Sequence, residues 1–159
     1  MPASAHSSCP CGGPAYATCC GPFIDGAAVP QTAEQLMRSR YSAYTRGLED
    51  YLRATWHPST LPAGPIVDTI APPQWLGLEV KSALRLRQRK VELADASKTA
   101  APAPAPGPER DTVEFVARYK VDGRAHRLHE VSRFVREPGP DGLRWFYLDG
   151  SFPDGHAQK

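Results

Sequence analysis

The spacing of hydrophobic residues is helical in the first third of the chain. Between positions 32 and 58 these residues lie three or four apart, and those that share one helical face are Met37, Tyr41, Tyr44, Leu48 and Tyr51. Thr32 is suited to cap a helix and Pro58 to end it. Gly47 lies inside the stretch and predicts a division into two helices. One more short helix is expected in the proline-bounded stretch 64–76.

The second half of the sequence alternates between hydrophobic and other residues, which indicates β-strands. The first strand is expected from Trp75 onward, with an interruption near positions 82 and 83, and the other three at 112–121, 124–136 and 143–149. Asp122 and Gly123 indicate a two-residue hairpin turn, and a longer turn is expected at 138–142.

The same alternation assigns side chains to the two faces of the expected sheet. One face of the second strand carries Val113, Phe115, Ala117 and Tyr119, and one face of the last strand carries Trp145, Tyr147 and Asp149. Helices followed by an antiparallel meander predict an α+β fold, in which the helices pack on a curved sheet.

Length and composition favour one globular domain with a small appendage, because the 159 residues are 41% hydrophobic and 23% charged. Residues 94–110 are rich in proline and alanine, so we expect a solvated loop there, with a proline-rich docking peptide as the alternative. A net charge of +2 does not indicate a dedicated nucleic-acid-binding protein. The chain has neither a membrane-spanning run nor a secretory signal, so a cytoplasmic location without a membrane partner is expected.

All four cysteines fall within twelve residues, as Cys9, Cys11, Cys19 and Cys20. Such clustering in a reducing compartment indicates metal ligation rather than disulfide bonding. Four thiolates favour one Zn²⁺, with iron as the lesser alternative. A site closed by four protein ligands is structural rather than catalytic. Two other interpretations stay open: a redox-sensing thiol pair, and a metal bound by three cysteines and His6.

Several short motifs resemble one known family. In chain order they are CPCG, the CC pair, LMRSRYSAY, TWHP, WLGL, FVARY, HEVSRF and WFYLDG. This set, which covers nearly the whole chain, is similar to the YchJ family of small bacterial proteins.

The resemblance implies three parts: a zinc-binding knuckle related to the SEC-C motif at 1–30, a cone-shaped nuclear-transport-factor-2-like (SnoaL-like) domain at 31–153, and a tail at 154–159. The seven residues between Cys11 and Cys19 are one fewer than is usual in a SEC-C motif. The cysteine motif that many members carry at the C-terminus is missing, so one metal site is expected. The resemblance implies no particular reaction.

A cone can enclose a pocket, and the candidate pocket residues are Arg38, His57, Glu130, Arg133, Trp145 and Asp149. Glu130 or Asp149 could act as an acid or base, with an arginine as an anchor for an anion. Alternation places Glu130 and Arg133 on opposite faces, which weakens that set. The alternative is structural: Arg38 or Arg40 pairs with one of the two carboxylates, the tryptophans belong to the core, and His57 interacts with a helix C-terminus.

Three functions follow from these features. The first is a binding or interaction module whose knuckle contacts a protein partner, by analogy with SEC-C proteins a chaperone or ribosome-associated one. The second is a small-molecule enzyme or ligand carrier that uses the cone. The third, an RNA-contacting protein, depends on the arginines of RLRQRK at 85–90, which are more typical of a solvated strand face. An open cavity with a buried carboxylate favours the second, and a cone filled by its own side chains favours the first.

Overall fold

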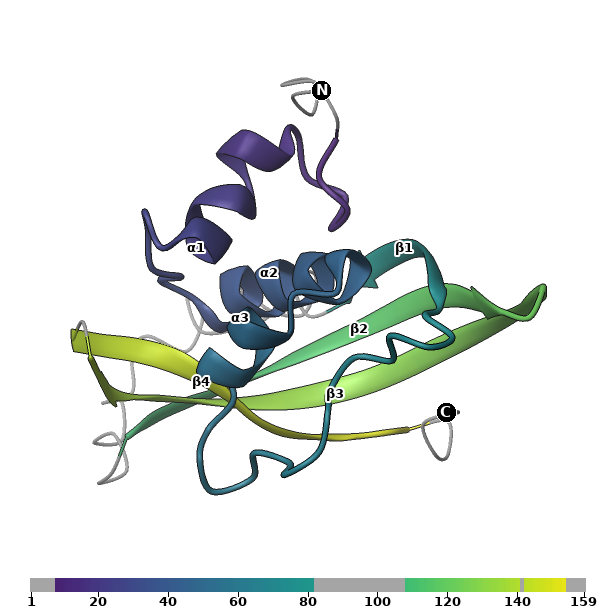
Figure 1. Cartoon of the computed structure of the whole chain (residues 1–159). Helices are drawn as coiled ribbons and strands as arrows, with labels where there is room; N and C mark the ends of the chain where they lie inside the picture. The colour runs from purple at the N-terminus through teal and green to yellow at the C-terminus, as the bar shows by residue number, and fades with distance from the viewer. Residues whose placement is uncertain (1–7, 82–107, 141, 154–159) are drawn as a thin grey trace, which may run out of the picture.

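In the computed structural model, a helical layer lies on one face of a curved four-stranded sheet (Figure 1). The structure describes residues 8–81, 108–140 and 142–153. The helices are η1 (Tyr16–Thr18), α1 (Gly21–Asp25), α2 (Ala33–Arg46) and α3 (Glu49–Ala54). The strands are β1 (Gln74–Val80), β2 (Glu109–Val121), β3 (Arg124–Gly139) and β4 (Gly142–Ser151), antiparallel neighbours in that order. This confirms the predicted α+β fold.

The expected helix boundaries at Thr32 and Gly47 are confirmed. The Thr32 hydroxyl accepts a hydrogen bond from the Gln35 amide at 3.1 Å, which caps α2. Gly47 ends α2 in a left-handed conformation, with φ at +66°, that is accessible to glycine at low cost. The chain turns there and resumes as α3 at Glu49.

The short helix expected at 64–76 is wrong. Both carboxylate oxygens of Glu49 accept hydrogen bonds from the backbone amides of Ile66 and Val67, at 2.9 to 3.1 Å. Asp68 accepts the amides of Ile70 and Ala71 in a local turn. These carboxylates hold the segment in turns, and only Gln74–Val80 at its end is regular, as strand β1.

The strand predictions are largely confirmed, with two differences. Asp122 and Gly123 both have positive φ, at +51° and +75°, as the predicted two-residue hairpin requires. The β3–β4 turn is tighter than expected, because Gly139 already pairs with Gly142. Strand β2 begins at Glu109, within the expected loop 94–110. The rest of that loop to residue 107, the interruption near 82 and 83 and the arginines of 85–90 lie outside the described residues.

A bulge in β4 changes the face of Asp149. Arg133 pairs with Asp149 and Phe134 with Tyr147, so Leu148 is an extra residue in β4. Tyr147 therefore shares the helix-facing side with Trp145, while Asp149 is on the opposite side. The expectation that all three share one face is wrong, because an inserted residue reverses the alternation beyond it.

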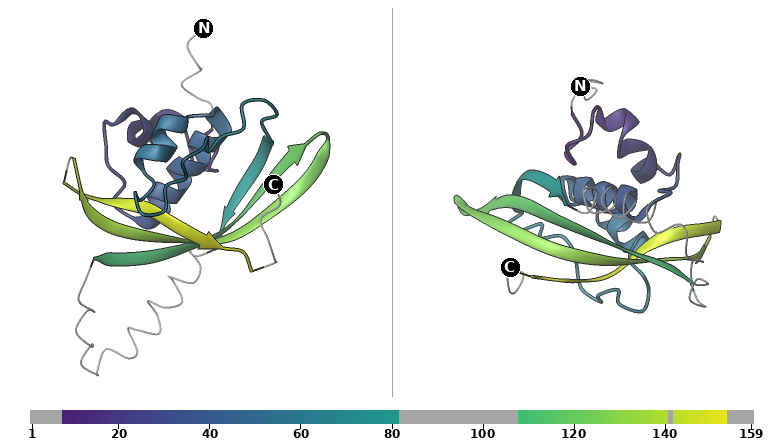
Figure 2. Two further views of the ribbon diagram at one scale, coloured as in Figure 1. Left: turned by 60° about the horizontal axis from the view of Figure 1, so that its bottom comes forward. Right: turned by 180° about the vertical axis from the view of Figure 1, so that it is seen from behind.

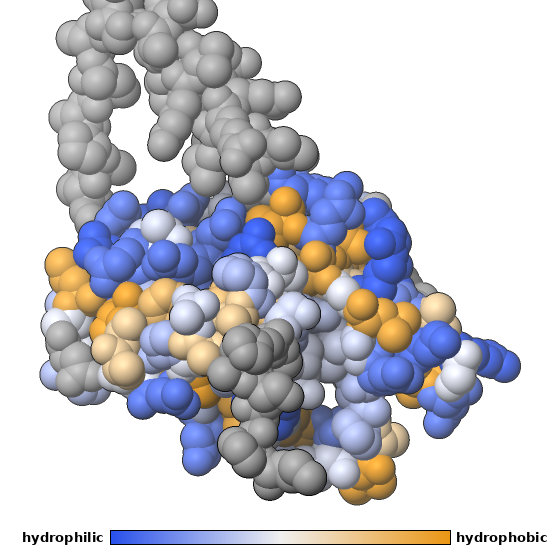
Figure 3. Space-filling view, turned by 90° about the horizontal axis from the view of Figure 1, so that it is seen from above, coloured by the Kyte–Doolittle hydropathy of each residue, from blue (hydrophilic) through white to orange (hydrophobic). Residues whose placement is uncertain are grey.

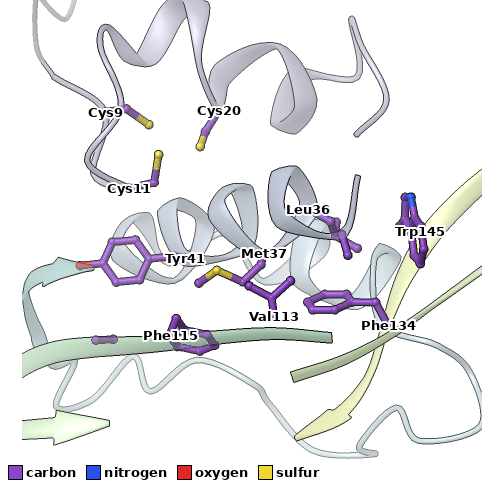
Figure 4. Close-up of a cluster of buried hydrophobic side chains, with 12 residues drawn as sticks. Cys9, Cys11, Cys20, Leu36, Met37, Tyr41, Val113, Phe115, Phe134 and Trp145 are labelled. Carbon is purple, nitrogen blue, oxygen red and sulfur yellow. The ribbon is translucent and has the colours of Figure 1, made fainter. Parts of the chain in front are cut away.

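The core is continuous from the sheet, through α2, to the cysteine segment. Leu36, Met37 and Tyr41 of α2 pack toward Phe115 and Phe134 of the sheet (Figure 4). Three of the four cysteines belong to the same buried cluster on the other side of α2. Two further views show the same order of layers, with α2 between the N-terminal segment and the sheet (Figure 2). Among the described residues, no helix is both long and apolar enough to span a bilayer.

Candidate metal centre and adjoining cavity

The four cysteines approach one another through two short pieces of backbone. In the first, the Gly12 amide donates to the Cys9 carbonyl at 3.0 Å and the Cys9 amide donates to the Pro14 carbonyl at 2.7 Å. This tight loop turns Cys9 and Cys11 inward. In the second, Cys19 follows η1 and Cys20 immediately precedes α1.

The sulfur atoms fit the ligand sphere of one metal ion. All four Sγ atoms lie within 4.8 Å of one another, with 3.5 Å between Cys11 and Cys19 and 3.9 Å between Cys19 and Cys20. Sulfur ligands at about 2.3 Å from a tetrahedral zinc ion are about 3.8 Å apart. The sulfurs of the three labelled cysteines point toward one another above α2 (Figure 4). The four thiols are free of disulfides, so the cluster suggests metal binding.

Burial and hydrogen bonding shift the pKa values of three thiols of this cluster in different directions. Hydrogen bonding from Cys20 lowers the pKa of Cys11 to about 4. Desolvation raises the pKa of Cys19 to about 12, and the hydrogen bond shared with Cys11 raises the pKa of Cys20. A bound dication would displace the remaining thiol protons and offset half of the negative charge of the four thiolates.

Gly13 is packed directly against the sulfurs. A Cβ atom at this position would lie 2.6 Å from Cys19 Sγ and 3.5 Å from Cys11 Sγ. The missing side chain of Gly13 therefore makes room for the ligand atoms.

Helix α2 is bound to the cysteine cluster by two polar contacts. Cys9 Sγ lies 3.5 Å from the hydroxyl of buried Ser42, and Arg38 donates to the Cys11 carbonyl at 3.0 Å. Arg38 also pairs with Glu34 at 3.2 Å. Arg38 was a candidate for the cone pocket, but the structure places it on the opposite side of α2, at the metal centre.

Between α2 and the sheet lies a cavity of about 380 Å³. Its wall is mainly aromatic and apolar, and includes Met37, Tyr41, Tyr44, Trp75, Phe115 and Phe134. A wider groove of about 980 Å³, bordered by residues 65–71, shares Ile66, Trp75 and Leu128 with the cavity. These three side chains therefore lie between the cavity and the groove.

One carboxylate, Glu130, is built into the cavity wall. Its Oε1 accepts a hydrogen bond from the Tyr147 hydroxyl at 2.8 Å, and burial raises its pKa. A Cβ at position 150 would lie 1.9 Å from the same oxygen, so only a glycine there leaves the carboxylate its place.

Arg40 is the cation of the cavity. It is 5% exposed, and its Nη1 donates to the Leu52 carbonyl at 2.8 Å and to the Thr55 hydroxyl at 2.7 Å. Its guanidinium lies 4.7 Å from the ring centroid of Tyr147, whose hydroxyl bonds Glu130. The predicted direct pairing of a buried arginine with Glu130 is therefore wrong: Arg40 and Glu130 each contact Tyr147 instead.

The remaining candidates lie outside the cavity wall. Arg133 and Asp149 form an ion pair on the outer side of the sheet. Trp145 is buried, as expected for a core residue, and donates to the Gln31 carbonyl. His57 lies beyond the end of α3, 2.7 Å from Glu137, and its amide bonds the Tyr147 carbonyl. The helix-terminal role expected for His57 is wrong, because it joins α3 to β4 instead.

The raised pKa of Glu130 predicts a pH effect on stability. Because the folded state binds this proton more tightly than the unfolded state, the contribution is favourable below the ordinary pKa of 4.5 and is lost as pH rises through the raised value. We therefore measure the free energy of unfolding in urea for Glu130→Gln and for the wild type. The difference between them should move in favour of the variant as the pH rises from about 5 to about 8. The expected size is about 1.4 kcal/mol for each unit by which the pKa is raised. A shift toward the wild type would contradict it.

Comparison with known proteins agrees with this architecture. The model of the family described as YchJ, middle NTF2-like domain, matches residues 32–150. The chain belongs to the YchJ family. A UPF0225 protein of Ralstonia nicotianae is 51% identical over 158 residues, covering 94% of this chain and 95% of that protein. One of Cupriavidus metallidurans is 53% identical over 147 residues, covering 89% and 86%.

Two solved structures extend the similarity to the cysteine segment of the YchJ-family chain. The solution structure of a SEC-C motif containing protein from Rhodopseudomonas palustris has a TM-score of 0.62 at 26% identity, covering 92% of this chain and 98% of that one. The crystal structure of a SEC-C motif containing protein from Psychrobacter arcticus has a TM-score of 0.63 at 26% identity, covering 98% and 88%. The predicted family and its NTF2-like fold are confirmed.

Proposed function

We propose that this YchJ-family protein is a zinc-stabilised, small-molecule-binding protein. One zinc ion bound by Cys9, Cys11, Cys19 and Cys20 fixes helix α2, and the cavity on the other side of α2 receives the ligand. The observation that carries this proposal is the double role of α2. Ser42 and Arg38 contact the cysteine cluster, whereas Arg40 and Tyr44 of the same helix line the cavity.

A structural role for the metal follows from the ligand set. Four thiolates complete a tetrahedral zinc site and leave no position for water or substrate. When bound, the ion would offset half of the charge of the four thiolates and would link the segment before η1 to the start of α1. The two polar contacts to α2 then carry this rigidity to the cavity wall.

Ligand binding in the cavity has more support than a protein contact through the knuckle. The cavity combines an aromatic wall with the buried carboxyl group of Glu130 and the buried guanidinium of Arg40. An apolar wall with a few polar groups is typical of small-molecule sites. On the face seen from above, hydrophobic residues lie in separate patches among hydrophilic ones (Figure 3). A knuckle-mediated protein partner remains a prediction of the sequence.

Metal analysis of the protein, purified without added zinc, tests the metal centre. We expect one zinc per chain by elemental analysis and no thiol that reacts until the metal is removed by a chelator. Iron in place of zinc would change the identity of the metal but keep the site. A folded, metal-free protein, or an intact mass two hydrogens light for each disulfide, would overturn the proposal.

A further inference from the structure

We propose that the cavity binds a neutral, flat, largely apolar molecule that donates a hydrogen bond to Glu130. This inference rests on the proposed function, in that the cavity must hold a ligand. It adds the chemical class of that ligand and the residue that recognises it.

The wall of the cavity favours a flat and mainly apolar ligand. Tyr41, Tyr44, Trp75, Phe115 and Phe134 supply ring faces and edges, and Trp75 packs in a T-shaped contact with Tyr41 at 5.5 Å. Aromatic walls of this kind favour planar ligands through stacking and edge contacts. A volume of about 380 Å³ is at the small end of ligand pockets, which suits a molecule of one or two rings.

The charges on the wall favour a neutral ligand. The Tyr147 ring faces the Arg40 guanidinium and its hydroxyl bonds the Glu130 carboxyl group, whose ionised form balances the charge of the arginine. An ionic ligand would add a charge to this balanced pair inside an apolar cavity. Burying an unbalanced charge is far costlier than burying a neutral polar group.

One hydrogen-bonding group of the wall, the Glu130 carboxylate, is suited to a donor on the ligand. Nη1 of Arg40 is committed to Leu52 and Thr55, and the Tyr147 hydroxyl is committed to Glu130. A carboxylate offers about four lone-pair directions, so Glu130 can accept a further bond after that of Tyr147. Gly150 leaves room for this carboxylate in the cavity wall, since any larger residue would displace it.

Three matched probes test this class by fluorine NMR on the zinc-loaded full chain. 4-Fluorophenol is a neutral donor, 4-fluoroanisole lacks the donor, and 4-fluorobenzoate is an anion. We expect the phenol to bind about ten-fold more tightly than the anisole, the value of one hydrogen bond to a charged group. Binding should also shift the indole N–H signal of Trp75, which lines the cavity, in proton–nitrogen NMR spectra of the same protein.

Two variants assign the effect to Glu130. Glu130→Leu, which removes the acceptor, should abolish the preference for the phenol over the anisole. Glu109→Gln, at an exposed position outside the cavity wall, should leave it unchanged. Because the readout is a ratio of two affinities on the same protein sample, a modest loss of folded protein does not mimic the result.

The outcomes separate this inference from the proposed function. If none of the probes binds, or if Trp75 does not respond, ligand binding in the cavity is wrong. If the anisole binds as well as the phenol, the cavity binds ligands but the donor class is wrong. If the benzoate binds most tightly, Arg40 rather than Glu130 selects the ligand and the neutral class is overturned.

Discussion

Replacing Cys11 with serine is expected to lower the free energy of unfolding by about 4 kcal/mol in a zinc buffer a thousand-fold above the wild-type dissociation constant. Cys11 is fully buried, and its sulfur lies 3.5 Å from that of Cys19, at a distance that suits two ligands of one ion. A loss of this size is a large part of the 5–15 kcal/mol, roughly, that stabilises most domains. Urea unfolding followed by circular dichroism measures it.

The control for this prediction is the same pair of proteins in excess chelator. Without metal, the wild type loses the contribution of the ion, so its stability should fall to near that of Cys11→Ser. If the variant is equally destabilised with and without zinc, Cys11 acts through packing alone. If the chelator has no effect on the wild type, the metal is not structural.

The cysteine cluster could be predicted from the sequence because its information is local. Cys9 and Cys11 are two positions apart, Cys19 and Cys20 are adjacent, and glycines and prolines between them allow a tight turn. Ligand type and spacing therefore identify the site without knowledge of the fold. The contacts of Arg38 and Ser42 with it required the structure, because these residues lie 27 and 33 positions after the cysteines that they contact.

The errors come from features that the local hydrophobic pattern does not mark. The backbone amides of Ile66 and Val67 donate hydrogen bonds to Glu49, seventeen and eighteen positions earlier. No local helix signal reveals these bonds. Asp149 changes face because of a bulge, and a bulge has no regular mark in the hydrophobic pattern. Of the six pocket candidates only Glu130 lines the cavity. Its face could be predicted because the alternation in β3 is uninterrupted where this strand pairs with β2.

Replacing Arg40 with methionine is expected to lower the free energy of unfolding by about 3–5 kcal/mol. Methionine keeps much of the apolar volume, but the Leu52 carbonyl and the Thr55 hydroxyl lose their donor at the end of α3. Glu130 also loses the nearby positive charge that favours its ionised form. Arg46→Met is the matched control in the same helix: this exposed arginine contacts Tyr16 in a cation–π arrangement, which is worth about 1 kcal/mol or less.

A double-mutant cycle then separates the two parts of the Arg40 effect. If the charge of Glu130 is compensated by Arg40 across the Tyr147 ring, Arg40→Met should cost less in the Glu130→Gln background than in the wild type. The cost that remains reports the hydrogen bonds to α3. Equal costs in both backgrounds would show that the two charges are independent. That result would contradict the balance of charge on which the preference for a neutral ligand rests.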